Sequence, residues 1–329
     1  MTTRLLEASV DWARLKPEQF QWVPCVLCGK FNYTTLATLV INWSEFYLVR
    51  CDSCDVVWRN PIPDSRFLND LYSEKYYNVA THSPSLVYQV GIADWDMPDQ
   101  NRRRTKTRQE VRAWEQRGLT PKDEFNEPRH LLEIGGGRGY LQRAAAELGW
   151  STLGLEISPY GIKAAIEQGL IVLPVTLEEL SEKFIPYRDY FDAVVFFDFL
   201  EHIPDPGLVL RLVRHVLKEG GSTVLRIPLS GDCPKLHLID HIWHFSRTSI
   251  AALLEREGFR EIEAVERGSL RRPMAIESRT SLYSRRRVLT DPWVWPSNNS
   301  MQRTALRAAA DAGRSPNLRQ VLMERLTEP

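Results

Sequence analysis

The chain lacks long apolar runs, is poor in cysteine and has no net charge. No run of apolar residues approaches the roughly 20 that span a bilayer, and the first residues lack the pattern of a secretory signal. Five cysteines in 329 residues exclude a disulfide-dense scaffold. The 42 basic residues equal the 42 acidic ones, which speaks against a surface coated with phosphate-binding cations. We therefore expect a cytoplasmic protein without a membrane partner, and nucleic acid is disfavoured.

The charge balance conceals two cationic segments. From Arg267 onward the chain has 12 Arg and no Lys against five acids, so this part carries +7 and the preceding 266 residues carry −7. A second stretch places six cations between Arg102 and Arg112. Two interpretations remain open: solvated faces, or a cationic rim beside a pocket for an anionic acceptor.

Composition divides the chain into four parts, although length alone predicts about two domains of roughly 150 residues. We expect a cysteine-rich and aromatic-rich cap at 1–80 and a helical insert at 81–128 that contributes to the substrate pocket. A core at 129–280 and an Arg-rich tail at 281–329 follow.

The core alternates nearly continuous apolar strands with amphipathic helices. Strands are predicted at 131–134, 152–156, 170–173, 191–197 and 223–227, and helices at 140–148, 159–168 and 208–217. The glycine pair at 220–221 is expected to end the last helix. This alternation indicates an α/β fold with a doubly wound, mostly parallel sheet. Such a sheet binds ligands at the carboxyl ends of its strands.

A glycine-rich loop follows the first core strand. Glu133 ends the strand, and glycines stand at 135, 137 and 139, where a bare backbone lets a ligand approach closely. A dinucleotide fingerprint begun at Gly135 would need a glycine in place of Tyr140. A nicotinamide-dependent oxidoreductase is therefore the weaker interpretation. The pattern acid-x-Gly-x-Gly-x-Gly resembles motif I of the class I S-adenosylmethionine-dependent methyltransferases, whose fold is Rossmann-like.

Three further segments match this family in its expected order. Glu156 ends the second strand, residues 191–206 resemble the fourth motif, and Leu-Lys-Glu-Gly-Gly at 217–221 resembles the usual Leu-Lys-Pro-Gly-Gly turn. The resemblance implies that Glu156 accepts the ribose hydroxyls, that Glu133 lies near the amino or carboxylate end of S-adenosylmethionine, and that residues 175–177 face the adenine. The cofactor-binding residues that it implies are Glu133, Gly135, Gly137, Glu156, Ile157, Thr176, Phe197 and Asp198.

Two Cys-x-x-Cys pairs stand in the cap. They are Cys25 with Cys28 and Cys51 with Cys54, and 22 residues separate the pairs. Each pair can place two thiolates on one cation, so together they complete a tetrahedral site of four cysteines. Disulfides are disfavoured in the cytoplasm, so we expect structural Zn²⁺ in a zinc ribbon. Cys233 is expected to be incidental.

The segments after the second pair, at 56–63 and 71–77, resemble bacterial small-molecule methyltransferases with an N-terminal zinc-binding domain. Among these are the deoxysugar C-methyltransferases of antibiotic pathways. In that group the zinc domain caps the active site, so Tyr72, Tyr76 and Tyr77 either face the acceptor or pack in the core. An RNA-modifying methyltransferase with a zinc ribbon is the alternative. The strand exit at Asp198 lacks the Asn/Asp-Pro-Pro-aromatic motif of enzymes that methylate exocyclic amines.

The candidate general base follows the fifth strand. Asp240-His241 precedes an aromatic-Phe-Ser segment ending at Ser246, and a similar segment of the sugar C-methyltransferases supplies their proposed base. A histidine can take a proton from a carbon acid or a hydroxyl, and an adjacent acid can orient it. We expect His241 as the base, with Asp240 beside it; His202 is either a second base or a packing residue. Leu238 departs from the sugar group, which has tyrosine there. The acceptor is expected to be a small metabolite methylated on carbon or oxygen.

Overall fold

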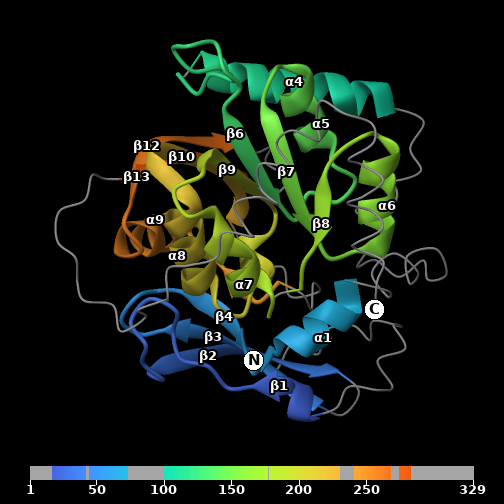
Figure 1. Ribbon diagram of the computed structural model, residues 1–329. Coiled ribbons are helices and arrows are strands. Elements are labelled where there is room, and N and C mark those ends of the chain that lie inside the picture. The colour runs from blue at the N-terminus through green and yellow to red at the C-terminus, as the bar shows by residue number, and fades with distance from the viewer. Residues whose placement is uncertain are drawn as a thin grey trace. The chain divides into compact units, whose positions relative to one another are not determined.

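The computed structural model describes residues 17–41, 44–72, 100–116, 118–176, 178–229, 241–267 and 274–282, all of which belong to one compact unit (Figure 1). Several predictions fall elsewhere: Tyr76, Tyr77, Leu177, Cys233, Leu238, Asp240 and the Arg-rich tail beyond Leu282 lie outside the described residues. Within the described ranges, no helix has the length and apolar character that a membrane crossing requires.

A seven-stranded sheet forms the core of the described chain. Its strands are β6 (His130–Ile134), β7 (Ser151–Glu156), β8 (Val172–Pro174), β9 (Phe191–Phe197), β10 (Leu217–Leu229), β12 (Phe259–Arg267) and β13 (Met274–Leu282). They lie in the order β12-β13-β10-β9-β6-β7-β8, and among them β13 alone runs in the direction opposite to that of the other six. The strand order reverses between β6 and β9, where such sheets bind ligands. The predicted doubly wound, mostly parallel sheet is confirmed.

Helices connect the strands as the sequence predicts. They are α5 (Tyr140–Glu147), α6 (Pro159–Glu167), α7 (Leu180–Phe184), α8 (Pro206–Val216) and α9 (Arg247–Arg256), with 3-10 turns at Ile185–Tyr187 and Leu200–His202. α4 (Gln100–Glu115) precedes the sheet, and its Val111 and Trp114 share a buried cluster with Leu141 and Ala145 of α5 (Figure 1). Ser246 caps α9 by accepting a hydrogen bond from the Ser249 N–H.

One predicted boundary is wrong. The glycine pair at 220–221 does not end α8, because the helix stops at Val216 and the pair lies within β10. Leu217 already pairs with Phe191 of β9, and regular pairing resumes at Ser222 after an irregularity that contains the glycines. Val216 and Leu217 are both buried, so the chain leaves α8 and enters the sheet before it reaches the glycine pair.

A second sheet combines the N-terminal part with a strand from the core. β2 (Tyr33–Ile41), β3 (Ser44–Cys51) and β4 (Val57–Asn60) form antiparallel pairs, and β11 (Trp243–His244) adds to β4. A 3-10 turn (Pro17–Gln19), the short strand pair β1 (Phe20–Gln21) and β5 (Ile62–Pro63), and α1 (Ser65–Asp70) complete this part. The buried rings of Trp58 and Trp243 lie 6.1 Å apart, centroid to centroid. The N-terminal part and the core therefore share one apolar interior.

Candidate active site

A cavity of about 460 Å³ lies at the carboxyl ends of the central strands. Seven of the eight predicted cofactor residues line it: Glu133, Gly135, Gly137, Glu156, Ile157, Phe197 and Asp198. Thr176 is not among the lining residues, and its hydroxyl donates to Glu179 over 3.0 Å. Val175, its neighbour, contributes to the wall instead. The order of the strands thus brings three separate loops to one cavity.

The glycine loop has a shape that side chains would block. Gly135 has φ +68°, and a Cβ there would stand 2.9 Å from the ring of Phe199. A Cβ on Gly136 would stand 2.8 Å from the Glu133 carboxyl group. Real Cβ contacts are longer, so the bare loop forms a cradle against which a ligand can lie.

Glu156 is fixed at the edge of this cradle. Its carboxylate accepts hydrogen bonds from the backbone N–H groups of Gly137 (2.7 Å), Ile157 (2.9 Å) and Ser158 (2.8 Å). Burial raises the pKa of this carboxyl group, and the three N–H groups oppose that rise. An oriented carboxylate in a cavity wall suits a ligand that offers hydroxyl donors.

Glu133 serves the loop as well as the cavity. Its side chain accepts a hydrogen bond from the Gln142 N–H over 2.9 Å and so caps the first turn of α5. Only 7% of the residue is exposed, and burial raises the pKa of its carboxyl group to about 8. This carboxyl group therefore holds the loop and the helix together on the cavity side.

In the cationic stretch between Arg102 and Arg112, some side chains lie at the surface and others line the cavity. Arg108 faces Glu147 over 3.8 Å with both side chains about half exposed, whereas Lys106 lines the cavity. Arg226 of β10 also lines the cavity, and it forms an ion pair with Asp198 over 2.7 Å. The Arg226 guanidinium group further lies 4.4 Å from the centroid of the Phe197 ring.

A group of aromatic and histidine side chains stands at one side of the cavity. Tyr72 and His202 line it, and the Tyr72 hydroxyl is hydrogen-bonded to Nδ1 of His202 over 3.0 Å. The rings of His202 and His241 meet edge to face with centroids 4.6 Å apart. The two predicted histidines, 39 residues apart in sequence, are therefore in contact.

Backbone hydrogen bonds fix the segment that carries His241. The Ile242 N–H donates to the carbonyl of Glu201, and the Ile242 carbonyl accepts from the N–H of Arg59 in β4, each over 2.9 Å. The sequence did not indicate Glu201, whose fully buried carboxylate lies 3.7 Å from Nε2 of His202. The one sequence signal that could have identified Glu201 is its position next to the candidate base His202. His241 is only 7% exposed and is not among the residues that line the cavity.

The four paired cysteines converge as predicted. Their Sγ atoms all lie within 4.8 Å of one another, and the Sγ atoms of Cys28 and Cys51 are 3.6 Å apart. A disulfide would require about 2.05 Å, whereas four sulfurs at about 2.3 Å from a tetrahedral zinc ion lie about 3.8 Å apart. Each pair also closes a tight turn, in which Gly29 donates to the Cys25 carbonyl and Asp55 to the Cys51 carbonyl. The donor set and its spacing fit a zinc ion.

Comparisons with known proteins find sequence similarity to methyltransferases. Residues 102–264 match the family model described as "Methyltransferase domain". A ubiquinone biosynthesis O-methyltransferase of Xanthomonas oryzae pv. oryzae is 30% identical over 105 residues, which are 30% of this chain and 44% of that protein. Its counterpart in Pseudomonas aeruginosa is 34% identical over 101 residues, 29% of this chain and 42% of that protein. The chain thus spans less than half of the length of these relatives.

A solved structure with a weaker likeness is the 1,6-didemethyltoxoflavin-N1-methyltransferase of Burkholderia thailandensis. It shows 14% identity and a TM-score of 0.48, and the match covers 77% of this chain and 100% of that one. In sequence, residues 102–264 are thus similar to methyltransferase domains.

Proposed function

We propose that the chain transfers the methyl group of S-adenosylmethionine to carbon or oxygen of a small-molecule acceptor, with histidine removing the acceptor's proton. One observation supports this proposal most: a contacting pair of histidines, one of which lines the cavity formed by the glycine loop. The curated relatives are named as O-methyltransferases, which favours oxygen. The resemblance to deoxysugar enzymes favours carbon.

The cavity residues fit S-adenosylmethionine, which supplies an electrophilic methyl group when bound. The glycine loop admits it closely, and Glu156 offers a preoriented carboxylate to the ribose hydroxyls. Since such a transfer depends on alignment, the protein contributes mainly a fixed geometry. The walls from β6, β7 and β9 provide that geometry because they belong to one continuous sheet.

The acceptor's proton is taken by the His202–His241 pair. His202 stands at the cavity wall, where Tyr72 holds Nδ1, and the nearby Glu201 carboxylate stabilises the positive charge that the imidazole gains. His241 was the favoured base in the sequence, with Asp240 to orient it. Its ring meets that of His202 edge to face, so in this proposal the base is one of two histidines in contact.

The four-cysteine cluster is proposed to hold one structural zinc ion, with residues 1–80 forming a zinc-ribbon cap. Asn69 and Tyr72, which follow the cysteines, line the cavity and support a capping role. The divisions 81–128, 129–280 and 281–329 remain our proposed insert, core and tail. Metal analysis should find about one zinc per chain, and Cys28→Ser should lower that content. A wild-type protein purified without zinc would refute the ribbon.

The test of the reaction uses methyl-labelled S-adenosylmethionine with phenol, enol and keto-sugar acceptors. A labelled product formed on carbon or oxygen supports the proposal, and its NMR shift separates the two. Transfer to RNA, accompanied by a steep salt dependence of RNA binding, would instead establish the alternative.

A further inference from the structure

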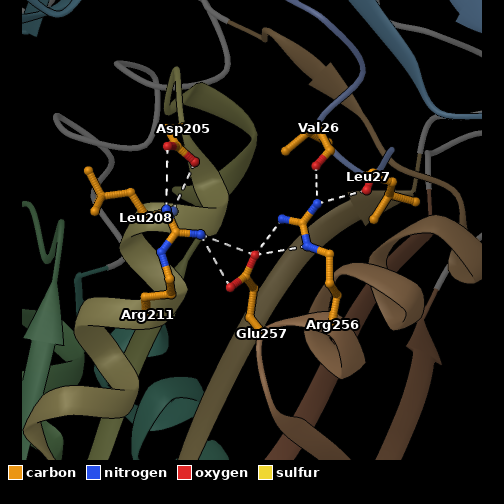
Figure 2. Close-up of polar contacts among 7 residues, drawn as sticks. All are labelled: Val26, Leu27, Asp205, Leu208, Arg211, Arg256 and Glu257. Carbon is orange, nitrogen blue, oxygen red and sulfur yellow. Dashed lines mark hydrogen bonds and ion pairs between the residues drawn. The ribbon is translucent and has the colours of Figure 1, made fainter. Parts of the chain in front are cut away.

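A network of charged groups ties the end of α9 to the first cysteine turn (Figure 2). Arg256 is the last residue of α9, and its Nη1 donates to the carbonyls of Val26 and Leu27, the second over 2.9 Å. These two residues stand between Cys25 and Cys28. A residue of α9 thus holds the loop that carries two of the four thiols, although 230 positions separate Arg256 from Val26 in the sequence.

Glu257 orients the guanidinium group of Arg256. Its carboxylate accepts from Nε of Arg256 over 2.9 Å and from Nη2, while Arg211 of α8 approaches both carboxylate oxygens at 3.3 Å. The Glu257 side chain is only 7% exposed. Arg256 therefore uses one edge of its planar group for the carboxylate and the remaining nitrogen for the two carbonyls, which the five donors of an arginine permit.

The stability of α9 does not by itself explain why a glutamate occupies position 257. Glu257 is the C-cap of α9, where the negative end of the helix dipole disfavours a carboxylate. Burial adds a further penalty unless cations pair with the group. Gly207 of α8 leaves room for the network, since a Cβ there would lie 2.9 Å from both Nη2 of Arg256 and Oε1 of Glu257. The two arginines compensate the acid, and the acid fixes Arg256.

A zinc ion with four thiolates carries a net charge of −2, so a cation beside the site stabilises it. Groups that support metal ligands from outside typically contribute about 10- to 100-fold to metal affinity. Arg256 brings a positive charge to the first cysteine turn and restrains its backbone at two consecutive carbonyls. Both effects favour the loop conformation that presents Cys25 and Cys28 together.

We propose that Arg256, oriented by Glu257, is a positioning residue for the cap's metal centre and couples zinc binding to the core segment 241–257. This inference rests on the proposed zinc site. The coupling has a second connection, because Val57, three residues after Cys54, pairs with His244 in β11. The segment that begins at His241 and ends at Glu257 is therefore attached to both cysteine pairs. Linkage requires the effect to be reciprocal: if α9 favours zinc binding, zinc must stabilise α9.

The first experiment measures zinc affinity by competition with a chelator in the full-length wild type, Arg256→Ala, Arg256→Lys and Glu257→Gln. We expect affinity to fall about 10- to 100-fold in Arg256→Ala. The loss of zinc affinity should be smaller in Arg256→Lys than in Arg256→Ala, because lysine keeps the positive charge. Some loss should remain, because one ammonium group cannot serve both carbonyls and the carboxylate. Glu257→Gln should also give a partial loss, because a neutral amide orients the guanidinium less firmly. The matched control is Arg247→Ala, since Arg247 begins the same helix but pairs with Glu261 of β12; its zinc affinity should equal that of the wild type.

The second measurement is hydrogen exchange with and without chelator. Zinc removal should accelerate exchange of the α9 amides in the wild type and in Arg247→Ala, but much less in Arg256→Ala, while β6 and β9 stay unchanged. S-adenosylmethionine binding checks that each variant is folded; if Arg256→Ala does not fold, Arg256→Lys and Glu257→Gln decide by the same affinity criterion. Equal zinc affinity in the wild type and in all three variants of the network would overturn the inference about Arg256 but would leave the proposed zinc site standing. A wild type that binds no zinc would refute the metal site itself.

Discussion

Replacing Glu133 by Gln tests whether a buried, proton-binding carboxyl group holds the glycine loop. Burial raises the pKa of Glu133 from 4.5 to about 8, so the folded protein binds this proton more tightly than the unfolded chain does. The stability that this proton contributes is fully present below about pH 4.5 and is lost as pH rises through about 8. Gln keeps an oxygen for the Gln142 N–H and does not titrate.

The size of the effect follows from the two pKa values. Between pH 6 and pH 8 the wild type should lose about 2 kcal/mol of unfolding free energy relative to Glu133→Gln. Urea denaturation without cofactor at both pH values measures this difference. The control is Glu124→Gln, at an exposed position, whose stability should follow that of the wild type. If the stability of Glu133→Gln changes with pH in parallel with that of the wild type, the Glu133 carboxyl group is not the site of the buried proton.

Two further predictions concern the cavity. His202→Gln and His241→Gln should each lower kcat by about 100- to 10,000-fold while S-adenosylmethionine binding is retained, as calorimetry can show; normal turnover in both would remove the pair from the mechanism. Gly135→Ala should weaken S-adenosylmethionine binding about tenfold or more, because alanine at φ +68° costs about 1–2 kcal/mol and its Cβ meets Phe199. Gly118→Ala has a similar φ of +80° but open space around its Cβ, so it should lower stability without changing that affinity; equal affinity losses in both variants would contradict the cradle.

The sequence predicted those parts of the fold that arise from local pattern. The apolar run at 191–197 coincides with β9 because a strand buried on both faces needs continuous apolar residues. The glycine loop was recognised because its spacing reflects positive φ angles and close contacts. Each signal is contained within a few consecutive residues of the chain.

Features that depend on distant pairing could not be predicted. β11 has only two residues, too few to show a period of two, and it is a strand only because β4 lies beside it. Glu201 is fully buried, whereas composition rules place acids at the surface. The contact of Arg256 with Val26 joins opposite ends of the described chain, and no local pattern encodes it.

Isothermal titration of the purified protein with S-adenosylmethionine and with NAD tests the central claim most directly. We predict saturable binding of S-adenosylmethionine, weakened about tenfold or more in Glu156→Gln because charge-assisted hydrogen bonds to the ribose are lost, and no binding of NAD. Binding of NAD without binding of S-adenosylmethionine would contradict the account.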